Sequence, residues 1–183
     1  RRVAELLGVP PTQVEVRRRC APCGATDHGK PAIAPVPGAP APPAVNLAHS
    51  GTVAVVAIST AGPVGVDVEA DRPNMDWASH HSHVFSDPEW AATERATDPQ
   101  TARLAAWTRK EAAAKATGHG VAVGLERVGI AESPEDGGWH AVTLPDGLGP
   151  ARVCDVELQA GHAAAVAVTG SGPTPCLTVR RHS

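Results

Sequence analysis

The amino-acid sequence predicts an α+β fold with mostly antiparallel sheets. Two similar α/β halves are expected to be related by a pseudo-two-fold axis. Two valine-rich runs, at residues 53–58 and 64–69, have the length and β-branched composition of buried strands. A capped helical stretch spans residues 99–117, and further strand-like runs follow it. Helices and strands therefore come in groups, helix then strands, twice along the chain, which favours the α+β class.

The first forty residues contain little predicted regular structure. Residues 1–8 resemble the last turns of a helix that stops at Gly8, and they lack the apolar run of a signal peptide. We therefore expect the chain to begin inside a longer gene product. Residues 12–16 are predicted to form a short strand. Repeated prolines between residues 17 and 43 predict a long surface loop, because proline disrupts helix interiors and central strands.

The rest of the chain alternates turn signals with periodic segments. Between the two valine-rich strands, Ala61-Gly62-Pro63 predicts a hairpin turn. Residues 77–85 are predicted to be helical, and Ser86 or Asp87 then caps a second helix with Pro88 in its first turn.

The long helix begins at Asp98-Pro99 and ends at Gly118, so it covers about 19 residues, or roughly 28 Å. Strand-like runs follow at residues 125–130, 139–144, 151–158 and 162–168. The two halves are expected to be residues 1–85 and 86–183.

Composition limits the classes of function. The 183 residues are 42% hydrophobic, so a normal core can form, and the net charge of −3 argues against a duplex-DNA binder. The sequence has no run of about 18 apolar residues, so no membrane span is expected. Only three lysines occur, and they are Lys30, Lys110 and Lys115. Arginine supplies the remaining permanent cations.

Residues 107–115 carry the strongest catalytic signal. Positions four apart on an α-helix are stacked neighbours, so Trp107, Glu111 and Lys115 are expected to share one face. Two of the three lysines flank this glutamate. Arginine does not replace lysine where a compact, proton-donating ammonium is needed, so the pattern indicates an acid–base site.

Asp67 and Glu69 form a second candidate site. Residues two apart on a strand face the same side at about 7 Å, and two carboxylates there repel unless a cation lies between them. Mg²⁺ takes one or two carboxylates together with substrate phosphates, so this pair predicts a magnesium site, strengthened by Glu111 as a third carboxylate. Taken alone, the same pattern also describes a solvated edge-strand face.

Three groups have a structural as well as a functional interpretation. His49 lies at a strand end, where it is either a turn residue or a donor to a phosphate. Lys30, taken alone, is a solvated loop lysine. The histidines of residues 80–83 are interpreted as an exposed helix face in preference to a metal site.

The cysteines give little information on their own. Cys20 and Cys23 form a C-x-x-C pair to which His28 could add a third zinc ligand. A zinc knuckle would need a second matching pair, and Cys154 and Cys176 are isolated, so a reduced turn is the favoured interpretation.

Four motifs, in their order and spacing, resemble the surfactin-type 4'-phosphopantetheinyl transferases. They are His-Gly-Lys-Pro at residues 28–31, Asn-Leu-Ala-His-Ser-Gly at 46–51, Val-Gly-Val-Asp-Val-Glu at 64–69, and Trp-Thr-Arg-Lys-Glu at 107–111 with its continuation to Gly118. Residues 161–168 are also similar to that family's last strand. The resemblance covers nearly the whole chain, and its last two motifs together are specific.

The resemblance implies transfer of the 4'-phosphopantetheine arm of coenzyme A to a serine of an apo acyl or peptidyl carrier protein, with release of 3',5'-ADP. It implies that Asp67, Glu69 and Glu111 hold Mg²⁺, or alternatively Mn²⁺, on the pyrophosphate of coenzyme A. It further implies a cytoplasmic, monomeric pseudo-dimer, without nucleic-acid or membrane partners, serving polyketide, nonribosomal peptide or fatty acid synthesis.

The resemblance also assigns the cations. Lys115 would contact the phosphate and protonate the departing ADP oxygen, and Lys110 would add positive potential. Lys30 and His49 would bind the nucleotide end, including its 3'-phosphate. Glu111, or a water on the metal, would deprotonate the carrier serine.

The chain departs from the family pattern at two points. Ala48 replaces a frequent serine, so one hydroxyl contact to coenzyme A is expected to be absent or supplied by Ser50. Family members also have several tens of residues before the position of Arg1, including basic residues that help to bind coenzyme A.

Two other functions use the same residues. A metal-dependent nuclease or phosphodiesterase would also surround Mg²⁺ with Asp67, Glu69, Glu111 and a lysine, although an acidic chain offers little for a nucleic-acid groove. A zinc-stabilised protein-binding module would use the histidines with Cys20 and Cys23, and it would leave the face of Glu111 and Lys115 unexplained.

Overall fold

A computed structural model describes residues 1–181 of the chain. The helices are α1 (Arg2–Leu7), α2 (Trp77–Val84), α3 (Asp87–Glu94) and α4 (Pro99–Thr117). The strands are β1 (Val16–Arg19), β2 (Lys30–Ile33), β3 (Ala44–Ser50), β4 (Val53–Ser59), β5 (Val64–Ala70), β6 (Gly129–Ile130), β7 (Trp139–Thr143), β8 (Pro150–Asp155) and β9 (His162–Thr169). Every strand pairing is antiparallel, which confirms the predicted α+β class.

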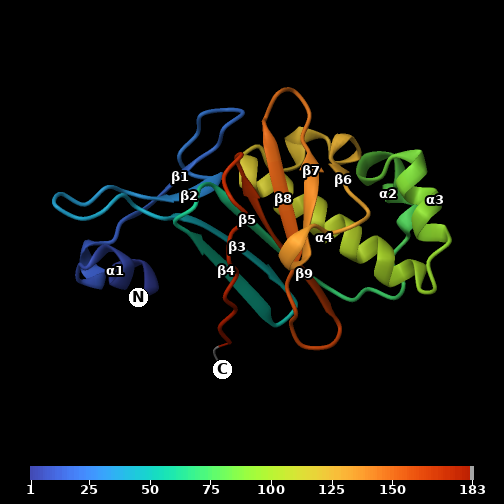
Figure 1. Ribbon diagram of the computed structural model, residues 1–183, viewed down its shortest axis with the longest axis horizontal. Helices are drawn as coiled ribbons and strands as arrows, with labels where there is room; N and C mark the ends of the chain where they lie inside the picture. Colours follow the sequence, from blue (N-terminus) through green and yellow to red (C-terminus); the bar gives the residue numbers. More distant parts are fainter. Residues whose placement is uncertain (182–183) are drawn as a thin grey trace.

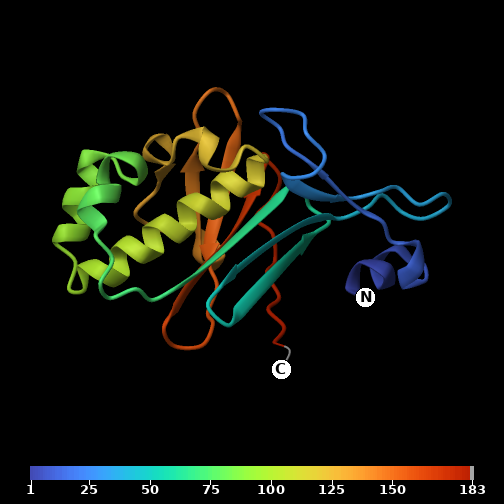
Figure 2. The same ribbon diagram turned by 180° about the vertical axis from the view of Figure 1, so that it is seen from behind.

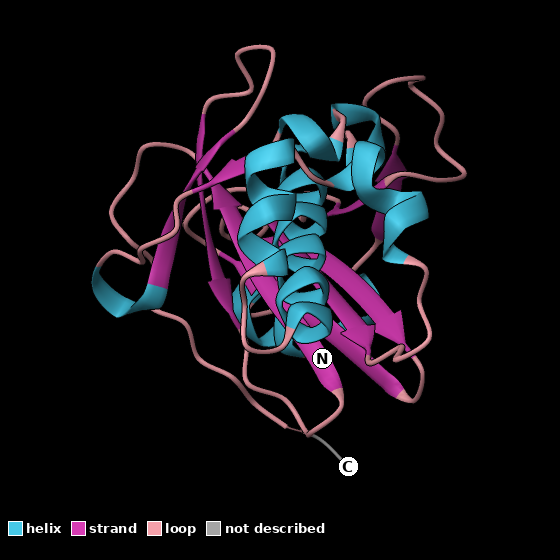
Figure 3. Ribbon diagram, turned by 90° about the vertical axis from the view of Figure 1, so that its right-hand side faces the viewer, coloured by secondary structure: helices cyan, strands magenta, loops and turns pink. Residues whose placement is uncertain are grey.

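A five-stranded sheet forms the centre of the fold, in the order β5-β9-β8-β7-β6. The long helix α4 runs diagonally across one face of this sheet (Figure 2). Helices α2 and α3 lie at the N-terminal end of α4, where Figure 3 shows the helices in front of the strands. Trp77 begins α2 and Phe85 follows its last residue. Both side chains are buried there and join the main core beneath α4.

Small residues let α4 approach the sheet closely. Ala112, Ala113 and Ala114 are fully buried, as are Ala165 and Ala167 on β9. Both ends of the helix follow the sequence prediction. Asp98 accepts a hydrogen bond from the backbone N–H of Thr101, and Gly118 takes the left-handed conformation that ends the helix.

The β3–β4 hairpin covers the outer edge of β5 (Figure 1). Two β3 side chains satisfy backbone groups along this edge: Asn46 Oδ1 accepts from the Val66 N–H at 3.0 Å, and Ser50 Oγ accepts from the Ala70 N–H at 3.0 Å. The hairpin turn predicted at residues 61–63 is therefore wrong. β4 pairs with β3, and the chain crosses at this point to the five-stranded sheet, where β5 pairs with β9.

The Pro-rich segment also contains more structure than its composition predicts. The segment from 17 to 43, expected to be one loop, contains nearly all of a two-stranded hairpin that pairs β1 with β2. Proline is tolerated there because Pro31 lies in a strand with a single partner. The strand expected at residues 12–16 is instead a 3₁₀ turn at Pro11–Gln13, and β1 begins at Val16.

Most other predicted elements begin and end within two residues of the observed ones. Residues 125–130 are an exception, because they form a 3₁₀ turn at Leu125–Arg127 before the short strand β6. The division into residues 1–85 and 86–183 remains a prediction, and β5 and β9 hydrogen-bond across it. Within the described part of the chain, every helix is too short or too polar to cross a membrane.

Candidate active site between strand β5 and helix α4

Strand β5 presents alternate residues to two different layers. Val66 and Val68 are buried against Ala48 of β3 and the β4 side chains. The other face meets α4, because a Cβ added at Gly65 would lie 2.9 Å from the Ala116 Cα atom. Period-two alternation therefore directs Asp67 and Glu69 toward the helix that carries Glu111 and Lys115.

Asp67 and Lys115 form the centre of this arrangement. Lys115 Nζ donates to Asp67 Oδ1 at 2.6 Å, and the Asp67 residue is only 3% exposed. The second oxygen, Oδ2, is buried and has no hydrogen-bond partner. Burial raises the pKa of Asp67 to about 6, while Lys115 opposes this shift and the nearby Glu111 and Glu69 charges add to it.

The other two carboxylates have partners of their own. Glu69 Oε2 accepts from Ser50 Oγ at 3.1 Å and from Arg72 at 3.0 Å. Glu111 Oε1 faces the indole N–H of Trp107 at 3.4 Å, one helical turn earlier, as the four-residue spacing predicts. Both glutamates are partly exposed, in contrast to Asp67.

The three carboxylates lie near one another without forming a closed ligand cage. In residues 1–181, no group of three acidic oxygens that includes them lies within 4.8 Å of one another. Like charges repel, and each acid is held by a separate donor. The unpartnered Asp67 Oδ2, with two further carboxylates close enough to shift its pKa, nevertheless suits an oxygen-preferring divalent cation such as Mg²⁺.

Lys30 lies at the C-terminal end of α4. Its Nζ donates to the Ala116 carbonyl at 2.6 Å, and this ammonium compensates the partial negative charge of the helix end. Burial lowers the pKa of Lys30 to about 8. Lys30 is therefore a partly buried helix cap, and its ammonium bonds the residue that follows Lys115.

His49 and Ser50 point to opposite sides of β3. His49 is exposed, as is Leu47 on the same side of the strand, whereas Ser50 is buried. The Ser50 hydroxyl is occupied by Glu69 and the Ala70 N–H. It therefore orients a carboxylate of the site, and it is not free to replace the hydroxyl that Ala48 lacks.

Lys110 does not join the other cations. It is 1% exposed, and its Nζ donates to Glu89 at 2.7 Å and to the Leu125 carbonyl at 3.0 Å. Burial lowers its pKa despite the Glu89 carboxylate. Successive helix residues are about 100° apart, so Lys110 turns toward α3 while Glu111 turns toward β5. The contribution of positive potential by Lys110 to the coenzyme A site stays a prediction, and the structure shows a structural role in the ion pair with Glu89.

Two of the three histidines of α2 have aromatic neighbours. His80 lies 5.5 Å from Trp107, and His81 stacks on Trp90 at 4.5 Å between ring centroids. Among the described residues the α2 histidines form no cluster with metal-ligand spacing, and their interpretation as a helix face remains a prediction.

Sequence reasoning missed three supporting residues. Gly65 permits the close contact of strand and helix, and a glycine inside a valine-rich strand was the available signal. Ser50 and Arg72 both bind Glu69. The sequence predicts Ser50 only as a contact to coenzyme A, and no local pattern marks Arg72.

Comparison with known proteins shows the family of the chain. The family model described as the 4'-phosphopantetheinyl transferase superfamily matches residues 63–167, which include β5, α4 and nearly all of β9. The transferase AcpT of Salmonella typhimurium is 42% identical over 96 residues, which are 50% of this chain and 47% of that protein. The transferase HetI of Nostoc sp. is 36% identical over 93 residues, covering 50% of this chain and 39% of its own length.

A longer match covers about three quarters of the chain. The transferase psf-1 of Bacillus pumilus is 32% identical over 140 residues, which are 76% of this chain and 57% of that relative. The chain thus spans about half the length of the curated relatives it matches. Since the family model covers more than half of the chain, the protein belongs to the 4'-phosphopantetheinyl transferase superfamily.

Proposed function

We propose that this protein transfers 4'-phosphopantetheine from coenzyme A to a serine of an apo acyl or peptidyl carrier protein, releasing 3',5'-ADP. The observation that carries the proposal is the ion pair of Lys115 with the buried Asp67, which lies near two further carboxylates and keeps one unpartnered oxygen. An ammonium beside a cation site suits cleavage of a diphosphate, because phosphoryl transfer depends on positioning and charge neutralisation.

The acids are assigned to metal binding. Asp67, Glu69 and Glu111 would hold Mg²⁺, or Mn²⁺ in its place, and the ion would neutralise the diphosphate charge and polarise its oxygens. The arrangement of donors supports this assignment. Ser50 and Arg72 orient Glu69, and Trp107 orients Glu111, so two flexible side chains are directed before the ion arrives.

Lys115 is assigned to the leaving group. Its side chain is 29% exposed, so the ammonium reaches both Asp67 and a bound substrate. An ammonium at this position neutralises charge on the departing ADP oxygen and can supply its proton. Glu111 is the proposed acceptor of the carrier serine proton, because it is the partly exposed carboxylate on the same helix face.

Lys30 and His49 are assigned to the nucleotide end of coenzyme A, including its 3'-phosphate. Lys30 uses one N–H on the Ala116 carbonyl, and an ammonium has three, so it retains donors for a phosphate oxygen. His49 is exposed on β3 and is free to meet a ligand.

We assign the protein to the surfactin-type group, and its similarity to psf-1 and the order of its motifs support this choice. The carrier would then belong to polyketide, nonribosomal peptide or fatty acid synthesis. We further propose that the enzyme acts as a monomer in the cytoplasm, where coenzyme A is available to it.

The test is incubation of the purified chain with coenzyme A, Mg²⁺ and an apo carrier domain, followed by mass spectrometry of the carrier. A mass gain of one phosphopantetheine is expected. Glu111→Gln should abolish the gain, while the matched control Glu132→Gln, an exposed glutamate outside the site, should keep it. DNA cleavage without carrier modification would support the nuclease instead. Metal binding without any turnover would support the protein-binding module.

A further inference from the structure

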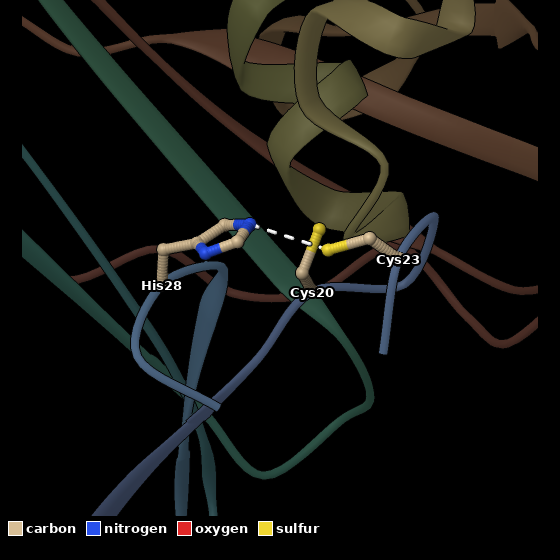
Figure 4. Close-up of side chains that lie close together, drawn as sticks. All are labelled: Cys20, Cys23 and His28. Carbon is tan, nitrogen blue, oxygen red and sulfur yellow. Dashed lines mark hydrogen bonds between the residues drawn. The ribbon is translucent and has the colours of Figure 1, made fainter. Parts of the chain in front are cut away.

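A compact cluster of two thiols and an imidazole lies in the loop that joins β1 to β2. The ligand atoms of Cys20, Cys23 and His28 all lie within 4.8 Å of one another, and the side chains point toward a common centre (Figure 4). None of the proposed transfer chemistry uses these residues. In the described chain this is the one group of three such side chains with metal-ligand spacing.

The backbone of the loop holds the two sulfurs on one side. The Gly24 N–H donates to the Cys20 carbonyl at 2.8 Å, and the Cys20 N–H donates to the Ala25 carbonyl at 2.9 Å. Gly24 has a φ of 73°, a left-handed conformation that an L side chain rarely adopts. The loop is thus a tight, hydrogen-bonded turn with Cys20 at its start and Cys23 at its end.

A second glycine brings His28 back to the cysteines. A Cβ at Gly29 would overlap the Arg19 carbonyl group and the Cys20 nitrogen, and the φ of Gly29 is 96°. Only glycine therefore allows the two ends of the loop to approach this closely. His28, the residue before it, is held beside Cys20 and Cys23 by this closure.

The imidazole is oriented as in a metal ligand. His28 Nδ1 lies 2.8 Å from Asp27 Oδ1, and its Nε2 lies 3.4 Å from Cys23 Sγ. When the carboxylate accepts a hydrogen bond from the Nδ1–H group, the Nε2 lone pair remains free. This lone pair faces the sulfurs. The carboxylate–histidine pair is the usual outer support of a histidine that binds zinc.

We propose that Cys20 Sγ, Cys23 Sγ and His28 Nε2 bind one Zn²⁺ ion, with Asp27 orienting the histidine and a water completing the tetrahedron. Two thiolates and one imidazole favour zinc over the harder Mg²⁺ or Mn²⁺. The ion is therefore distinct from the cation proposed on Asp67, both in ligand chemistry and in position.

The position of this loop gives the ion a structural consequence. A Cβ at Gly118 would lie 3.8 Å from Ala21 Cβ and 3.7 Å from Lys30 Cδ, so the loop abuts the end of α4. Zinc would fix the hairpin that carries Lys30 against the helix that carries Lys115. This consequence rests on the proposed function, whereas the zinc site itself does not.

The direct test is the metal content of the chain purified in a thiol reductant without chelators. One zinc per chain is expected by elemental mass spectrometry. After zinc removal, Co²⁺ should give the intense absorption of a cobalt–thiolate site. Cys23→Ser should remove both signals, while Cys176→Ser, which alters an exposed and isolated cysteine, should keep them.

Asp27→Asn is the second variant, because it retains all three ligands and does not threaten the fold. It should weaken zinc binding by about 10- to 100-fold in a competition titration with a chromogenic chelator. Wild-type zinc content no higher than that of Cys23→Ser would overturn the proposal. A Cys20–Cys23 disulfide in the freshly purified, thiol-trapped protein would also overturn it. These readouts measure metal and thiols, so they are independent of whether carrier transfer is observed.

Discussion

Substitution of Gly65 by alanine tests whether the close contact between β5 and α4 creates the site. The added Cβ would lie 2.9 Å from Ala116 Cα and nearer still to the Ala112 carbonyl oxygen and the Ala116 nitrogen. These are backbone atoms of a helix, so they cannot rotate away. Ordinary carbon–carbon contact is about 3.5–4.0 Å, so α4 must move away by roughly 1 Å.

Two measurable losses follow from that displacement. Overpacking of this size costs about 1–3 kcal/mol of unfolding free energy, measured by urea denaturation. The same movement would disturb the 2.6 Å contact between Lys115 and Asp67, and a misplacement of about 1 Å can lower a catalytic rate by about 100-fold. The rate of carrier modification should therefore fall more than stability alone explains.

The matched control is Gly129→Ala in strand β6. A Cβ there would meet only Thr143 Cβ, at an ordinary 3.7 Å. Alanine should be neutral or slightly stabilising at this position, because it reduces the entropy of the unfolded chain. If Gly65→Ala matched Gly129→Ala in both stability and transfer rate, the close contact would not position the site.

Three further substitutions test individual side chains. Asp67→Asn should stabilise the chelator-treated protein at neutral pH by up to about 3 kcal/mol, because a carboxyl whose pKa is raised from 3.8 to about 6 on folding destabilises the folded state above that pH. The difference should vanish as the pH of urea denaturation falls from 6 toward 4, and a wild type more stable than the variant at neutral pH would disprove the desolvation argument. Lys115→Ala should lower the transfer rate constant strongly in single-turnover kinetics, whereas an effect confined to coenzyme A affinity would remove its role toward the leaving group. Lys110→Met should lower the unfolding free energy by about 1–3 kcal/mol, since Glu89 and the Leu125 carbonyl lose their donor. A raised Michaelis constant for coenzyme A without destabilisation would instead support a role of Lys110 in the coenzyme A site.

The sequence predicted those parts of the fold that depend on local chemistry. Asp98 and Gly118 mark the ends of α4 because a side-chain acceptor and a left-handed residue act on neighbouring backbone groups. The alternation of β5 likewise follows from its own residues. Partners distant in sequence could not be predicted, and β5 pairs with β9, almost one hundred residues later, in place of the adjacent β4.

The site shows the same division. Spacing alone placed Trp107, Glu111 and Lys115 on one helix face. The 100° step between neighbouring residues turns Lys110 away from that face, but its partner could not be predicted, because Glu89 lies in another helix. The β1–β2 hairpin in the Pro-rich segment could not be predicted from composition, because its pairing depends on the tight closure at Gly29.

The most direct test of the account is a count of Mn²⁺ ions bound in the presence of coenzyme A, with free Mn²⁺ followed by electron paramagnetic resonance. One ion per wild-type chain is expected, and Asp67→Ala and Glu111→Ala should each abolish tight binding while Glu132→Ala retains it. Unchanged Mn²⁺ affinity in Asp67→Ala or in Glu111→Ala would contradict the claim that carboxylates from β5 and α4 share one cation.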